Sequence, residues 1–122
     1  MKVVLIEDDK DLSEMFVEAL KKEDLEIKVA FDGEEGLELI KSETPDIVLL
    51  DVVMPKKSGF EVLEEMKKTP GLENMPVIIL TVLNKDDDIK NGLQLGAEDY
   101  IVKSQHTIAN IVNKVQKVIN DQ

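Results

Sequence analysis

The chain has 122 residues, of which 43% are apolar and 3% aromatic, and its formal net charge is −11. This length and composition fit one globular domain with a single aliphatic core and argue against disorder. All 15 basic residues are lysines, set against 26 acidic residues, so the surface repels nucleic acid and anionic lipid and we expect neither as a partner. The absence of cysteine excludes disulfides, thiolate catalysis and cysteine-based zinc sites.

The N-terminal apolar run, Val3 to Ile6, is too short for a signal peptide or a membrane span, so the expected location is the cytoplasm. No repeat, low-complexity segment or linker divides the sequence. We therefore expect one domain over residues 1–122, with no output domain.

Short apolar runs, typical of strands buried on both faces, alternate with amphipathic helical patterns along the whole chain. The expected strands are, in chain order, residues 3–6, 27–30, 47–50, 77–80 and 100–102. The expected helices pass through residues 12–20, 37–40, 60–66, 86–95 and 108–119. Asp9 or Asp11 would cap the first helix, and Gly96 would end the fourth. Five strand–helix units predict a mostly parallel sheet with right-handed connections and helices on both faces.

Polar residues stand directly after four of the five expected strands. Glu7 and Asp8 follow the first strand, Asp51 the third, Thr81 the fourth and Lys103 the fifth. Because the carboxyl ends of parallel strands meet at one edge of a sheet, we expect these side chains to lie together, where such sheets bind ligands.

The residue types at this edge suit phosphoryl chemistry. Carboxylates packed together repel one another, which raises their pKa values until a cation binds, and oxygen-only ligands favour Mg²⁺ or Ca²⁺ over zinc. An aspartate such as Asp51 can attack phosphorus. A divalent cation and the Lys103 ammonium would neutralise the phosphoryl oxygens, and the Thr81 hydroxyl would donate a hydrogen bond. The cluster therefore predicts phosphoryl acceptance that needs no histidine of this chain.

Four motifs, each at a strand end and in order along the chain, carry a resemblance to a known family. They are Glu7-Asp8, the stretch Asp51-Val52-Val53-Met54-Pro55 with Gly59, Thr81, and Lys103. Over essentially all 122 residues the chain resembles the receiver domain of two-component response regulators, and in particular the stand-alone chemotaxis type. The resemblance implies a flavodoxin-like (βα)5 three-layer sandwich whose parallel five-stranded sheet has the order 2-1-3-4-5.

The same resemblance implies roles for individual residues. Asp51 would be the phosphoacceptor; Asp8, Asp51 and the backbone carbonyl of Val53 would ligate Mg²⁺, with Glu7 acting through a metal-bound water. Thr81 and Lys103 would contact the phosphoryl group. Tyr100 matches the family's switch aromatic, which turns inward when the threonine moves toward the phosphate.

It also implies partners. The donor would be a phosphohistidine on a sensor histidine kinase or histidine phosphotransfer protein, and the target a protein bound through the fourth helix, fifth strand and last helix. We expect a monomer or a weak, phosphorylation-dependent dimer. The protein would promote only its own phosphorylation and dephosphorylation, so we do not expect an enzyme.

Three departures from the family pattern stand out. Lys103 precedes Ser104 rather than proline, which favours a trans bond and a less firmly placed lysine. Val82 replaces the usual Ala or Gly after the threonine, which would narrow access to Asp51. Val53 and Leu83 are apolar where polar groups are common; we hypothesise that they hinder attacking water and lengthen the phosphoryl lifetime.

Two other functions remain open. Glu7-x-Asp9 faintly resembles the nucleophile-x-acid pair of Mg²⁺-dependent phosphatases with an aspartate nucleophile, although Asp9 fits better as a helix cap. Alternatively, the chain is a receiver-like scaffold that is not phosphorylated, which requires the changes at Val82 and Ser104 to be disabling.

Overall fold

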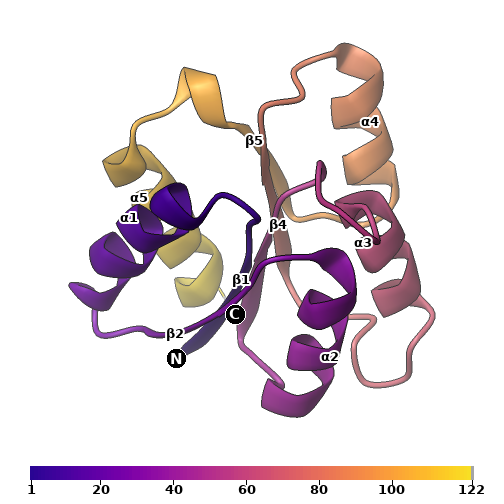
Figure 1. Ribbon diagram of the computed structural model, residues 1–122, viewed down its shortest axis with the longest axis horizontal. Helices are drawn as coiled ribbons and strands as arrows, with labels where there is room; N and C mark the ends of the chain where they lie inside the picture. Colours follow the sequence, from indigo (N-terminus) through magenta and orange to yellow (C-terminus); the bar gives the residue numbers. More distant parts are fainter. Residues whose placement is uncertain (122) are drawn as a thin grey trace.

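The computed structural model describes residues 1–121, in which strands and helices alternate as the sequence predicts (Figure 1). The strands are β1 (Lys2–Ile6), β2 (Glu26–Ala30), β3 (Ile47–Leu50), β4 (Val77–Thr81) and β5 (Asp99–Val102). The helices are α1 (Lys10–Lys21), α2 (Gly33–Glu43), α3 (Gly59–Lys67), α4 (Asp86–Gln94) and α5 (Ile108–Asn120), with a 3₁₀ turn η1 at Lys103–Gln105.

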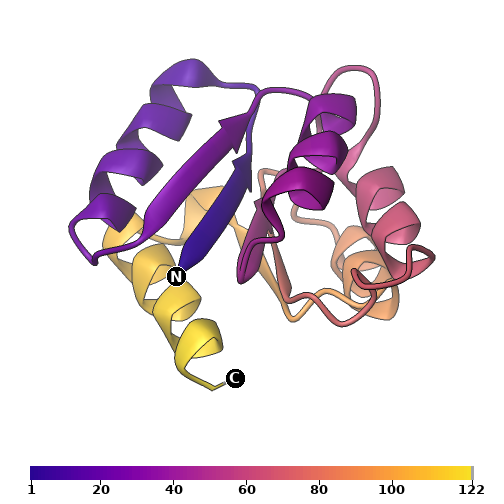
Figure 2. The same ribbon diagram turned by 90° about the horizontal axis from the view of Figure 1, so that it is seen from below.

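All strand pairs are parallel, and the sheet order is β2-β1-β3-β4-β5. Figure 2 shows the neighbouring arrows of β1 and β2 running the same way. This confirms the flavodoxin-like fold and the strand order that the resemblance implied. The order places β1 and β3 side by side, so the residues that follow these two strands emerge next to each other.

Alternate strand residues face opposite sides, which builds two hydrophobic cores. Along β4, Val77 and Ile79 belong to the core under α2 and α3, whereas Ile78 and Leu80 belong to the core under α1 and α5. The two views place α1 and α5 on one face and α2, α3 and α4 on the other (Figures 1 and 2). The three-layer arrangement holds the sheet rigid and leaves its carboxyl edge open.

Helix ends follow local capping chemistry. The Asp9 side chain accepts a hydrogen bond from the Leu12 N–H at 3.1 Å, so Asp9 is the cap of α1 as predicted. α2 ends at Thr44, whose φ of 41° lies in the left-handed region, directly before Pro45. Gly96, with φ of 106°, follows the last turn of α4 as expected.

Several strand bounds differ from the sequence-based expectation by one residue: β1, β2 and β5 begin one residue earlier, and β4 ends one residue later, at Thr81. Lys103 opens the short 3₁₀ turn, which apolar periodicity does not reveal. Within residues 1–121, no helix combines the length and apolar character that crossing a membrane requires.

Candidate functional site

Three carboxylates gather at the carboxyl edge of the central strands. Glu7 and Asp8 follow β1 and Asp51 follows β3, and one carboxylate oxygen of each lies within 4.8 Å of those of the other two. Glu7 and Asp51 are buried, whereas Asp8 is exposed. The three acids lie together, as the strand-end argument predicts, and the cluster has two buried acids, which form its floor, and one acid at the solvent.

Lys103 joins the two buried acids. Its Nζ donates to Glu7 Oε1 and, at 3.1 Å, to Asp51 Oδ2, although Lys103 enters from beyond β5. The Lys103–Ser104 peptide is trans, as are the other peptide bonds of residues 1–121. With two partners and a side chain only 13% exposed, Lys103 is held more firmly than the missing proline suggested.

The electrostatics of the cluster centre on Glu7. Burial raises its pKa to about 7, and the negative charge of Asp51 adds to the rise, while Lys103 and the Asp9 N–H, which donates at 3.2 Å, offset it only in part. Burial acts to lower the pKa of Lys103, but the hydrogen bonds and charges of Glu7 and Asp51 outweigh it, so that pKa is raised. The contacts with Lys103 therefore do not fully offset the cost of burying the Glu7 charge.

The loop after β3 closes tightly behind Asp51. A Cβ at Gly59 would lie 2.1 Å from the Asp51 carbonyl oxygen, so only glycine fits, and the Gly59 N–H donates to Val52 O at 2.9 Å. The Val53 N–H turns back to Asp51 Oδ1 at 3.3 Å, while the Val53 side chain is 53% exposed. This geometry fixes the orientation of the Asp51 carboxylate from its own loop.

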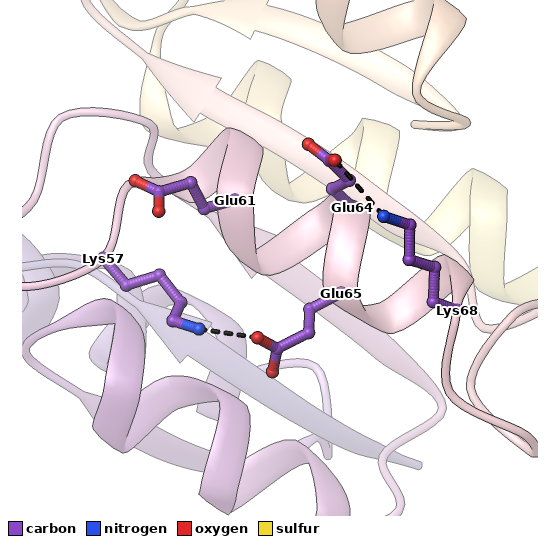
Figure 3. A pocket seen from close by; sticks show the side chains of 5 residues that line it. All are labelled: Lys57, Glu61, Glu64, Glu65 and Lys68. Carbon is purple, nitrogen blue, oxygen red and sulfur yellow. Dashed lines mark hydrogen bonds and ion pairs between the residues drawn. The ribbon is translucent and has the colours of Figure 1, made fainter.

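The far end of that loop is fixed by α2 and α3. A Cβ at Gly33 would lie 2.0 Å from the Lys57 carbonyl oxygen, so the loop backbone touches the start of α2. The Lys57 amine pairs with Glu65 at 2.6 Å on α3, beside a second pair between Lys68 and Glu64 at 3.5 Å (Figure 3). These charges satisfy one another across a shallow hollow, which makes them a surface network that anchors the loop rather than a second site.

Apart from Lys103, the residues described at the β4–β5 side of the edge are neutral. Thr81 is buried, and its hydroxyl accepts from the Leu83 N–H at 3.5 Å rather than contacting Asp51. The Tyr100 hydroxyl donates to the Leu83 carbonyl at 3.0 Å, and its ring packs against the core under α2 and α3. Burial raises the pKa of Tyr100 to about 12, with smaller contributions from Asp88 and Asp51.

The structure thus brings together Glu7, Asp8, Asp51 and Lys103, and places Thr81 and Tyr100 in a neighbouring chain of contacts through Leu83. Val82 is 61% exposed, and the narrowing of access to Asp51 that its size suggested stays a prediction. Sequence reasoning missed the backbone carbonyl of Leu83 as the partner of Tyr100, because no residue type marks a carbonyl acceptor.

The donor set fits a hard divalent cation. It consists of carboxylate oxygens alone, and one of the three acids lies at the solvent. Burial, with a smaller contribution from the charge of Asp51, raises the pKa of Glu7, and a bound cation would favour its ionised form.

Comparison with known proteins places this architecture in a family. The sequence model of the response regulator receiver domain matches residues 3–116. The receiver domain of the Francisella response regulator 1452 is 30% identical, with a TM-score of 0.90 over 98% of this chain and 97% of that one. The BeF3-activated N-terminal receiver domain of Klebsiella pneumoniae RstA is also 30% identical, with a TM-score of 0.88 over 98% of each chain.

The Mn²⁺-bound form of response regulator Rcp1 is 32% identical, with a TM-score of 0.81 over 96% of this chain and 90% of that one. Family match, strand order and the acidic edge agree with one another. The chain belongs to the response regulator receiver domain family.

Proposed function

We propose that this chain is a phosphoacceptor of two-component signalling in which Asp51 takes a phosphoryl group from a phosphohistidine. The observation that carries the proposal is the buried Asp51 carboxylate, held 3.1 Å from the Lys103 ammonium and beside two further acids. A carboxylate fixed in this way is poised as a nucleophile, and the fixed positive charge lies where negative charge of the incoming group must be balanced.

In the proposed transfer, an oxygen of Asp51 forms a bond to phosphorus while the bond from phosphorus to the imidazole nitrogen of the donor breaks. The electron pair of that bond stays on the imidazole. Lys103 would turn from Asp51 toward a phosphoryl oxygen, and Thr81 would leave the Leu83 N–H to donate to another. Bound Mg²⁺, held by Asp8, Asp51 and the Val53 carbonyl with Glu7 behind a water, would supply further positive charge.

The donor would be a sensor histidine kinase or histidine phosphotransfer protein. The readout would be binding of a protein target to the surface of α4, β5 and α5 around Tyr100, because the contacts from Thr81 through Leu83 to Tyr100 link that surface to the site. We infer a cytoplasmic signalling module that is not an enzyme with a separate substrate and that is monomeric, or weakly dimeric on phosphorylation.

The test is intact-mass analysis after incubation with acetyl phosphate and Mg²⁺. The wild type should gain one phosphoryl group, and Asp51→Ala should gain none. Asp11→Ala is the matched control, because Asp11 is an exposed acid in the first turn of α1 outside the cluster. Equal labelling of Asp51→Ala would remove Asp51 from the reaction, and no labelling of the wild type would favour a scaffold.

The phosphatase alternative makes a different prediction, multiple turnover on small phosphomonoesters. The position of Asp9 speaks against it, because its carboxylate caps α1 through the Leu12 N–H and is not among the three clustered acids.

A further inference from the structure

Helix α4 carries a glycine in its interior that its own sequence does not require. Gly92 is the one buried residue of α4, and glycine in a helix interior is less favourable than alanine because it loses more backbone freedom on folding. Gly92 therefore lowers the stability of α4 relative to alanine, and a favourable contact with another part of the molecule must offset this loss.

The space that a side chain at position 92 would fill is occupied. A Cβ there would lie 2.9 and 3.1 Å from Cδ2 and Cε2 of Tyr100, and 2.7 Å from Cδ1 of Ile79. The Tyr100 ring thus lies against bare backbone of α4 on its way from β5 to the Leu83 carbonyl, to which its hydroxyl donates at 3.0 Å.

Ile79 and Tyr100 differ in how freely they can move when a methyl group is added at position 92. Ile79 is fully buried in β4, and its δ-methyl is surrounded by the core. Tyr100 is only partly buried, and a change of its side-chain torsion would carry the ring toward solvent. Crowding at position 92 should therefore displace the ring and break its hydrogen bond to Leu83.

We propose that Gly92 is a positioning residue for Tyr100: its missing side chain makes the seat in which the ring lies inward against α4. The proposal deepens the switch role of Tyr100 within the proposed function and rests on it for its signalling meaning. The ring already lies inward in this structure, so within the proposal the seat exists before the movement of Thr81 that the family resemblance would couple to it.

The chain provides a clean probe, since Tyr100 is the only tyrosine and there is no tryptophan. Acrylamide quenching of the intrinsic fluorescence of the full, unphosphorylated chain therefore reports the exposure of this ring alone. For Gly92→Ala we expect the quenching constant to rise about two-fold, because the ring passes from partly buried to largely exposed. Asn91→Ala, at an exposed position of the same helix, should match the wild type.

A second variant separates the two neighbours. Ile79→Val combined with Gly92→Ala removes the Ile79 δ-methyl and should still show the raised quenching, because the ring remains crowded. Quenching of Gly92→Ala equal to that of the wild type would overturn the proposal, and so would recovery in the double variant, which would assign the crowding to Ile79. Because the measurement needs no phosphoryl group, failure of labelling at Asp51 would leave its result readable.

Discussion

The two halves of the carboxyl edge are held together by different forces. The first half consists of the carboxylates that follow β1 and β3 together with Lys103, which reaches them from beyond β5, and its contacts join full charges. The second half consists of Thr81, Leu83 and Tyr100, which are held by neutral hydrogen bonds and by the packing of one ring. Buried charges are costly to separate, whereas a neutral hydrogen bond contributes little net stability. The charged half is therefore suited to hold a reacting group in place, and the neutral half to change conformation at small cost.

The largest difference between the two halves is expected when Lys103 is replaced. Lys103→Met leaves the buried Glu7 and Asp51 without their cation, and we expect the free energy of unfolding at pH 7 to fall by about 4 kcal/mol. Urea denaturation measures this. Lys114→Met is the control, because Lys114 pairs with Asp99 at 3.7 Å with both side chains well exposed, and it should cost less than about 1 kcal/mol. Equal losses would mean that burial adds nothing to the Lys103 contacts.

The pH dependence of the free energy of unfolding tests the charged half through Glu7. The pKa of Glu7 is about 7 in the folded protein against 4.5 for the free group, so between these values the folded state keeps a proton that the unfolded state has lost. The contribution of Glu7 to stability should therefore fall by up to about 3 kcal/mol as the pH rises from 4.5 to 7.

The measurement is the difference in unfolding free energy between the wild type and Glu7→Gln, which carries no titrating group, across this pH range. Added Mg²⁺ should flatten the decline, since a cation favours the ionised carboxylate. A difference that rises with pH would contradict the raised pKa.

The rate at which the phosphoryl group is lost tests which half of the edge limits the access of attacking water to it. Val53 belongs to the loop of the charged half and Leu83 to the neutral half, and replacing both with Asn and Gln should speed dephosphorylation about ten-fold, or about 1.4 kcal/mol of activation free energy. Intact-mass decay curves of the two single variants would assign the effect to one half. Leu93→Ala, at an exposed apolar residue in the last turn of α4, should leave the rate unchanged. An unchanged rate in the double variant would discard the apolar-shield hypothesis.

The smallest effect is expected in the neutral half. Tyr100→Phe removes one hydrogen bond, to the Leu83 carbonyl, and should lower the free energy of unfolding by about 1 kcal/mol. Circular dichroism in urea is the suitable measurement, because the variant has lost the only tyrosine of a chain without tryptophan. A loss as large as that of Lys103→Met would erase the distinction between the halves.

The sequence predicted the contacts of the charged half more completely than those of the neutral half. Glu7, Asp8, Asp51 and Lys103 stand at strand ends, and parallel strands bring such ends together whatever the details of packing. The strand order itself came from family resemblance, since alternation of strands and helices is compatible with several orders.

The remainder depends on close tertiary contact that no local pattern encodes. The tight approach of Gly59 to Asp51, of Gly33 to Lys57 and of Gly92 to Tyr100 becomes visible only when two segments are placed against each other. The 3₁₀ turn at Lys103 is likewise too short for a periodic signal.

The contact of Lys103 with Glu7 spans 96 residues of chain. During synthesis both acids and the first four strands leave the ribosome before the lysine that neutralises them. The cluster is therefore completed by the last strand–helix unit of this domain to be made, and a nascent chain that ends at α4 holds Asp51 without the ammonium that contacts it.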